Sequence, residues 1–275
     1  MSDNRLFKLD FDGFGSLYRY LSEQRPVNDR AGSLCSPSAD WDLDLGFDGA
    51  CQIAHDGGHW SAGAKSLLKA HSGITAGAVR YQHDIDYDYA GGALDVCEYL
   101  AGSDECFIAA GDDAGNQRFC KVAVNCGRAA KVKASEVMRR GGAILGAIDA
   151  LEGQGIQVSL TAVWASHWYL QRSGQEFGSL FTTEIKRAGE PWSAGAVAFA
   201  LCHPAMNRRL MFGCAERLEG CTAPDHNYGR AGSSKAARDI IQSKYDVFID
   251  GHTGGEFSTD EQARKFVARH FKAAA

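Results

Sequence analysis

A change in hydrophobic period between residues 135 and 164 constrains the fold more than any other feature of the sequence. In the first part, apolar side chains recur at the spacing of one helical face, at Val137, Ile144, Ile148 and Leu151. From Ile156 onward, apolar and polar side chains alternate, which is the period of a β-strand. A long helix followed immediately by a strand is the repeating unit of α/β domains, so we expect a fold of that class.

The other elements predicted in the second half fit the same class. Strands are predicted over residues 118–125, 156–164, 180–185 and 245–250, and helices over 135–151, 193–209 and 259–271. We expect Ser135 and Thr259 to cap the first and last of these helices and Pro204 to interrupt the second. The alternation predicts a mainly parallel sheet with helices on both faces.

Two adjacent glycines lie in the middle of the long predicted helix. Gly141 and Gly142 each cost about 1 kcal/mol relative to alanine at an interior helical position. We expect this cost to be offset by close packing of the helix on the sheet.

The first half predicts shorter and more mixed structure. Short helices are expected over residues 14–21, from Gly46, and over 60–70, and the alternation in 83–90 is typical of a strand with one solvated face. Segments 106–110 and 118–125 flank the turn-rich sequence GDDAGNQ, which indicates a β-hairpin. We therefore divide the chain into an acidic, mixed, mostly helical region over 1–117 and an α/β domain over 118–275 on which it packs.

Charge is distributed unevenly along the chain. Residues 1–120 hold 9 Lys and Arg against 19 Asp and Glu, a net charge of −10, whereas residues 121–275 hold 20 against 15, a net charge of +5. Opposite charges favour docking of the two parts within one chain or between copies. The expected partner is a protein, including copies of this chain, because a net charge of +5 is too small to predict nucleic-acid binding.

Composition also predicts where the protein works. No apolar run approaches the roughly 18 to 20 residues of a membrane span, and the first residues lack the cationic and apolar segments of a secretory signal. The nine cysteines are odd in number and come without an export signal, so we expect reduced thiols. These features predict a cytoplasmic protein with no membrane partner.

Residues 118–275 resemble the von Willebrand factor A domain. The resemblance rests on a first strand with the sequence VAVN, a long helix, two consecutive strands, a second helix, and a strand that ends in FIDG. It implies an open α/β sheet of the von Willebrand A or Rossmann-like kind, with a divalent cation held at one edge by oxygen ligands.

The positions that this resemblance assigns to the metal lack most of those ligands. Where the family has Asp-x-Ser-x-Ser after the first strand, this chain has Asn125, Gly127 and Ala129. The remaining oxygen donors are Asn125, Ser193 and Asp250. Such a set is too poor for a hard cation, so we expect a degenerate site without a metal and no cofactor.

A second resemblance covers three further segments. WSAGAKSLL, DVCEYLAGSDECF and VMRRGGAILGAIDALEGQG are similar to an uncharacterised family of bacterial and bacteriophage proteins. This resemblance implies a bacterial or phage-infected cell as the setting and supplies no activity.

Clusters of soft or acidic ligands give weaker metal candidates. Cys51, His55 and His59 have the i, i+4, i+8 spacing of one helical face, although two glycines at 57 and 58 interrupt the helix before His59. A second set lacks the C-x-x-C pair of structural zinc and comprises Cys202, His203, Cys214, Cys221 and His226. A third, Asp84, Asp86 and Asp88, lacks the glycine and glutamate of a calcium loop, so we interpret it as a solvated face.

The carboxyl edge of the predicted sheet is the place where open α/β sheets bind ligands. Binding residues predicted there are Asn125, Arg128, Ser193, Asp250 and His252, with Glu256 nearby. The leading hypothesis is a non-enzymatic interaction or assembly protein. The alternative is a hydrolase that uses His167, Asp250 and His252 as its catalytic groups.

Overall fold

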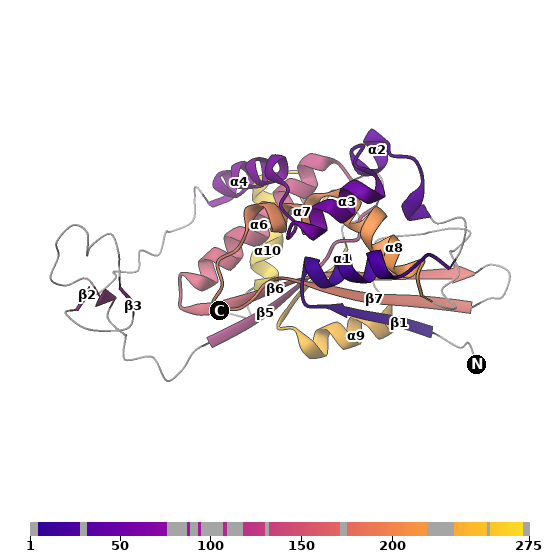
Figure 1. Cartoon of the computed structure of the whole chain (residues 1–275). Coiled ribbons are helices and arrows are strands. Elements are labelled where there is room, and N and C mark those ends of the chain that lie inside the picture. The colour runs from indigo at the N-terminus through magenta and orange to yellow at the C-terminus, as the bar shows by residue number, and fades with distance from the viewer. Residues whose placement is uncertain are drawn as a thin grey trace.

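A computed structural model of the chain shows one five-stranded sheet with helices on both of its faces (Figure 1). The structure describes residues 5–27, 32–75, 87–88, 93–94, 107–108, 118–129, 132–170, 175–218, 234–251 and 254–271. Among these residues, no helix is both long and apolar enough to cross a membrane.

The sheet has the strand order β1-β7-β6-β5-β8. Its strands are β1 (Arg5–Phe11), β7 (Gln175–Lys186), β6 (Ile156–Leu170), β5 (Arg118–Asn125) and β8 (Val247–Ile249). The pairs β1 with β7, β5 with β6 and β5 with β8 are parallel, and β6 with β7 is antiparallel. The predicted α/β class and the mainly parallel sheet are therefore confirmed, while β1 was not predicted.

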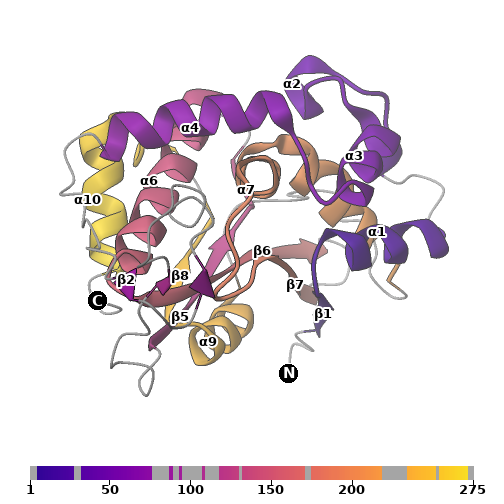
Figure 2. The same ribbon diagram turned by 60° about the vertical axis from the view of Figure 1, so that its left-hand side comes forward.

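Helices cover the two faces unequally, as Figure 2 shows. The helices on the larger side are α1 (Phe14–Glu23), α3 (Gly46–His55), α4 (Ser61–Thr75), α6 (Ala134–Glu152), α7 (Ala194–Cys202) and α10 (Asp260–Phe271). The opposite face is covered by α9 (Lys235–Lys244), a helix that the sequence analysis missed; its buried Ala237 and Ile241 pack against Ala123, Val163 and Leu180 of the sheet.

The predicted hairpin between residues 106 and 125 is wrong. Strand β5 pairs in parallel with β6 and β8, whereas β4 (Phe107–Ile108) belongs to a separate small sheet between β2 (Tyr87–Asp88) and β3 (Ala93–Leu94). The turn chemistry of GDDAGNQ is local, but strand pairing is decided by burial, and β5 is apolar enough to occupy an interior position of the larger sheet, between β6 and β8.

The long helix α6 is present, and the four predicted apolar positions are buried on it. Lys133, two residues before the predicted Ser135, occupies its N-cap. Gly141 and Gly142 were expected to pack on the sheet, but they pack on other helices. A Cβ on Gly142 would lie 2.8 Å from the backbone nitrogen of His71 in α4, and one on Gly141 would lie 2.7 Å from Cys202 Sγ in α7. The glycines therefore allow close contact with two helices and not with the sheet.

The N-terminal region shares its core with the rest of the chain. Strand β1 is an edge strand of the main sheet, and Phe14, Leu17 and Leu21 of α1 pack in the same apolar core as α6 and β6. The short helix α2 (Ala39–Asp42) is fixed by a buried ion pair between Asp42 and Arg209. The division predicted at residue 117 thus does not coincide with a division of the sheet.

The helix predicted over residues 193–209 is interrupted as expected. Helix α7 ends at Cys202, and after Pro204 the chain forms a π-helical turn, η2 (Met206–Met211), followed by α8 (Phe212–Ala215). Thr259 caps α10 as predicted: its Oγ1 accepts a hydrogen bond of 3.2 Å from the backbone nitrogen of Gln262.

The contact between α4 and α6 gives a stability prediction. Gly142→Ala should lower the melting temperature, although alanine is the better helix former, because the new methyl group meets the backbone of α4 at 2.8 Å. Gly15→Ala is the matched control, since a Cβ on this exposed residue of α1 meets nothing within 4 Å. Thermal unfolding should show the control unchanged or up to about 1 kcal/mol more stable. A stabilised Gly142→Ala variant would contradict the close packing.

Candidate functional site

Asn125 is fully buried at the carboxyl end of β5, the central strand of the predicted site. Its Nδ2 donates to the carbonyl oxygen of Ala165 at 2.9 Å and to Asp250 Oδ1 at 3.0 Å. Its Oδ1 accepts from the backbone nitrogens of Gly127 at 3.0 Å and Ala165 at 3.4 Å. Both donors and both lone pairs of the amide are used within the chain, so Asn125 connects β5 with β6 and with the end of β8.

Asp250 follows β8 and lies beside Asn125, as the sequence analysis predicted. Its Oδ1 also accepts a hydrogen bond of 2.7 Å from the backbone nitrogen of Gly251, and its Oδ2 is 3.4 Å from Arg238 of α9. The carboxylate is therefore engaged by an amide, a backbone nitrogen and a guanidinium group. This arrangement makes Asp250 a connection between the sheet edge and α9.

A buried arginine from α6 completes this cluster. The guanidinium group of Arg140, 3% exposed, donates to the backbone oxygens of Asn125 at 3.1 Å and Asp250 at 2.8 Å. Burial lowers the pKa of Arg140 below its ordinary value, and the nearby Asp250 and Glu256 act in the opposite direction. The charged side chain of Arg140 therefore holds the carbonyl groups at the ends of β5 and β8.

The residues at this edge do not fit a divalent cation. The oxygen of Asn125 already accepts two hydrogen bonds, and the next two positions of the family motif, Gly127 and Ala129, offer no side-chain ligand. Arg140 adds a positive charge where a second cation would be repelled.

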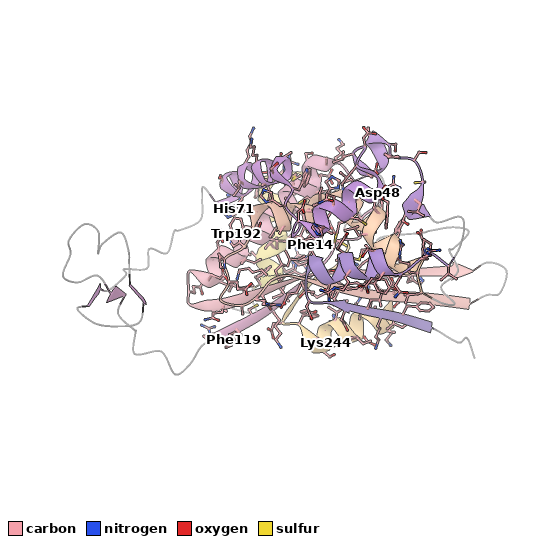
Figure 3. The ribbon with its side chains drawn as sticks, in the orientation of Figure 1. Phe14, Asp48, His71, Phe119, Trp192 and Lys244 are labelled. Atoms are coloured by element: carbon pink, nitrogen blue, oxygen red, sulfur yellow. The ribbon has the colours of Figure 1, made fainter. Side chains whose placement is uncertain are left out.

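Ser193, the remaining predicted ligand, lies at the other end of α6. It is the N-cap of α7, where its Oγ accepts from the backbone nitrogen of Ala196 at 3.3 Å. The adjacent Trp192 donates to Asp149 Oδ1 at 2.9 Å and lies beside His71 of α4 (Figure 3). Asp149 is nine residues beyond Arg140, roughly 14 Å along the helix axis. The prediction that Ser193 joins Asn125 and Asp250 is therefore wrong, because the antiparallel β7 returns the chain to the opposite edge.

The other residues of the predicted cleft do not converge in the described structure. His167 is exposed on β6, and Glu256 is exposed after Gly255. His252 lies outside the described residues. Arg128 is half-buried and donates from Nη1 to the carbonyl oxygen of Cys202 at 2.9 Å, which joins the loop after β5 to the end of α7.

The first soft-ligand candidate is not a cluster. Helix α3 ends at His55, which contacts Asp56 at 2.9 Å, and the turn that follows uses the positive φ angles of Gly57 and Gly58. His59 instead packs against Gly195 of α7. Within the part of the chain that the structure describes, no group of three His, Cys, Asp or Glu side chains is placed to hold a metal ion.

The second candidate set is structural where it is described. Cys202 and Cys214 are buried on helices, and burial raises the pKa of the Cys202 thiol to about 12. Burial also lowers the pKa of His203 to about 4, helped by the charge of Arg128, and its Nδ1 accepts from the backbone nitrogen of Ala205 at 3.0 Å. Cys221 and His226 lie outside the described residues, as do Asp84 and Asp86 of the acidic set, and the side chain of Asp88 is not described.

The described cysteines form no disulfide with one another. They are Cys35, Cys51, Cys120, Cys126, Cys202 and Cys214.

Sequence reasoning missed the buried arginines. Arg140 follows Val137 by three residues and precedes Ile144 by four, so its place on the buried face of α6 was readable from the periodicity. A charged residue at such a position requires several buried hydrogen-bond acceptors. For Arg140 these acceptors are the backbone oxygens at the carboxyl edge of the sheet.

The pairing of Asn125 with Asp250 gives a prediction with a pH dependence. Asn125→Asp should destabilise the protein by about 3 kcal/mol at neutral pH, because two donated hydrogen bonds are replaced by repulsion between neighbouring carboxylates. That repulsion raises a carboxyl pKa in the folded state, so the loss should be small near pH 4 and grow as the pH rises toward 7.

The double variant Asn125→Asp with Asp250→Asn keeps one carboxylate and one amide in the pair and should recover part of the stability. Chemical denaturation between pH 4 and 8 measures both variants. A pH-independent loss in the single variant would show that the two side chains do not interact.

The unsuitability of this edge for a metal predicts no stabilisation by divalent cations. Millimolar Mg²⁺, Mn²⁺ or Ca²⁺ should leave the melting temperature unchanged, whereas an ion at 100 times its dissociation constant would contribute about 2.7 kcal/mol. A saturable increase that Asp250→Ala abolishes would contradict this prediction.

Comparison with known proteins places the whole described fold in one family. A family model, a domain of unknown function (DUF7192), matches residues 3–274. No curated protein and no solved structure matches the chain. The match covers both the N-terminal region with β1 and the strands that carry Asn125 and Asp250, so the chain belongs to the DUF7192 family.

Proposed function

We propose that this chain is a non-enzymatic interaction protein of bacterial or phage origin that acts in the cytoplasm by assembling with copies of itself. The observation that carries this proposal is the edge strand β1, whose seven residues lie at one end of the strand order and, among the described strands, pair with β7 alone. The order of elements from β5 to β8 also supports a von Willebrand A-like domain with a degenerate metal site.

The internal bonding at the carboxyl edge favours this function over catalysis. Asn125 and Asp250 are engaged with each other and with backbone groups, and Arg140 holds the strand ends. A catalytic carboxylate needs access to a substrate or to a histidine that it orients. The hydrolase alternative with His167, Asp250 and His252 has no comparable support among the described contacts.

Edge strand β1 has the backbone groups and the charge pattern for pairing with a second copy. A strand at the edge of a sheet presents backbone donors and acceptors that another strand can pair with. Lys8 and Asp10 are both exposed. They line one small pocket with Tyr245 and with Lys244 of α9, so they lie on the α9 side of the sheet (Figure 3). The intervening Leu9 packs toward the apolar core on the other side.

This pattern is self-complementary in one antiparallel register. If Leu9 lies opposite Leu9 of the second copy, each Lys8 faces the Asp10 of the other strand. Two opposite-charge pairs then form around a two-fold axis, and each directly opposed pair contributes roughly 0.2–1 kcal/mol. The two neighbouring registers that keep these side chains on one face place Lys8 opposite Lys8, or Asp10 opposite Asp10.

Charge reversal tests the proposed dimer. Light scattering coupled to size exclusion should show a dimer of the wild-type chain near 50 mM NaCl that weakens toward 1 M, because exposed ion pairs are screened. Lys8→Glu should raise the dissociation constant at least tenfold, since it converts two attractive pairs into two repulsive ones. Asp10→Lys should have the same effect.

The two variants are each other's control. Mixed in equal amounts, Lys8→Glu and Asp10→Lys should form a heterodimer, because every opposed pair is again attractive. A wild-type chain that is monomeric at all salt concentrations would contradict the proposal of self-assembly. A dimer that neither variant weakens would show that β1 is not part of the dimer interface.

A further inference from the structure

Asp10, the acidic residue of the proposed β1 interface, is bonded to the neighbouring strand. Thr182 of β7 lies opposite Asp10 in the parallel register, and its Oγ1 donates to Asp10 Oδ1 at 2.7 Å. Thr182 is only 8% exposed, so water competes little for this hydrogen bond. Among the described contacts, Asp10 Oδ2 accepts no hydrogen bond. The carboxylate is therefore held from the β7 side through one oxygen and keeps the other for a second partner.

Lys8 has no such partner on β7. The residue opposite it is Leu180, which is buried, and Leu180 lines the same pocket as Ile240 and Ile241 of α9. These apolar side chains offer no acceptor to an ammonium group, and Lys244 adds a second positive charge to the pocket. In the described part of the chain Lys8 forms no ion pair. Its ammonium group is therefore available to a carboxylate from outside the chain.

The other charged groups near this pocket do not replace Thr182 as the partner of Asp10. Lys244 lines the pocket, but the described contacts include no ion pair between it and Asp10. Glu184, two residues beyond Thr182 on β7, is paired with Arg187 at 3.0 Å. The hydroxyl group of Thr182 is thus the group that fixes the side chain of Asp10 within the described structure.

We infer that Thr182 is a positioning residue of the proposed interface: its hydroxyl group fixes the carboxylate of Asp10 so that Oδ2 can accept the ammonium group of Lys8 from the second copy. The inference rests on the proposed function and gives β7 a part in selecting the register. A mobile aspartate loses rotamer freedom when the dimer forms, whereas a side chain that is already fixed loses little. The two-fold axis makes this effect act twice, once in each copy.

Removal of the hydroxyl group tests this role by light scattering near 50 mM NaCl. Thr182→Val should raise the dissociation constant of the dimer about tenfold, because one aspartate in each copy must then be ordered on association. Thr182→Ser keeps the donor and should stay within about twofold of the wild type. Thr183→Val is the matched control and should also stay within about twofold, since Thr183 is the next residue of β7, is fully buried, and its Oγ1 lacks a partner among the described groups.

A double variant separates positioning from a general effect on the fold. If Thr182 acts through the pair of Asp10 with Lys8 of the other copy, Thr182→Val should have little further effect in the Lys8→Met background, where no ammonium group approaches Asp10. A purely structural role of Thr182 would instead give the same loss of about tenfold in both backgrounds.

The rotamer of Asp10 tests the hydrogen bond in the monomer as well. In 1 M NaCl, where exposed ion pairs are screened, NMR couplings about χ1 of Asp10 should indicate one rotamer in the wild type and in Thr183→Val. In Thr182→Val they should indicate an average over rotamers. The measurement on the wild type decides the case even if Thr182→Val does not fold.

The outcomes for the inference and for the proposed assembly are distinct. A wild-type dimer that Thr182→Val leaves unchanged or tightens would overturn the inference and leave the assembly in place. Averaged couplings of Asp10 in the wild type, or an equal loss in Thr183→Val, would also overturn it. A wild-type chain that is monomeric at every salt concentration would contradict the assembly and, with it, the interface role of Thr182.

Discussion

The buried guanidinium group of Arg140 is the interaction on which the carboxyl edge of the sheet depends. Strands β5 and β8 end there. Arg140 donates to both ends from α6 and so ties helix to sheet. Asn125 and Asp250 complete the connection with side-chain hydrogen bonds. A buried charge is tolerable here because it is distributed over several acceptors, and removing them would leave it unsolvated.

A second buried arginine joins the N-terminal region to the rest of the core. Arg209 is fully buried, contacts Asp42 at 2.7 Å and donates to the backbone oxygens of Ser33 and Cys35. Burial pushes the pKa of Asp42 upward, but hydrogen bonds from Ser38 and Arg209 outweigh it and hold the pKa below its ordinary value. Part of the charge asymmetry between the acidic first half and the basic second half is therefore satisfied within one chain.

The sequence predicted the elements with a regular period and missed those set by tertiary contacts. Helix α6 and strand β6 were predictable because their apolar side chains repeat at 3.6 and 2 residues. The partners of β5 were not, since a hairpin is local whereas its parallel neighbours are distant in sequence. Asn125 and Asp250 were predicted together from the resemblance to the von Willebrand A domain. Ser193 was misplaced because its position depends on the antiparallel direction of β7.

Charge has a different role at the two edges of the sheet. At the carboxyl edge, Arg140 is buried and its guanidinium group is held by backbone oxygens, so its charge connects elements of the fold. At β1, Lys8 and Asp10 remain in water, so each pair is weak and its value lies in selecting one register. Strands β6 and β7 separate β1 from β5 in the sheet. Charge reversal at Lys8 should therefore act on the dimer alone and leave the hydrogen bonds that join Asn125, Asp250 and Arg140 in place.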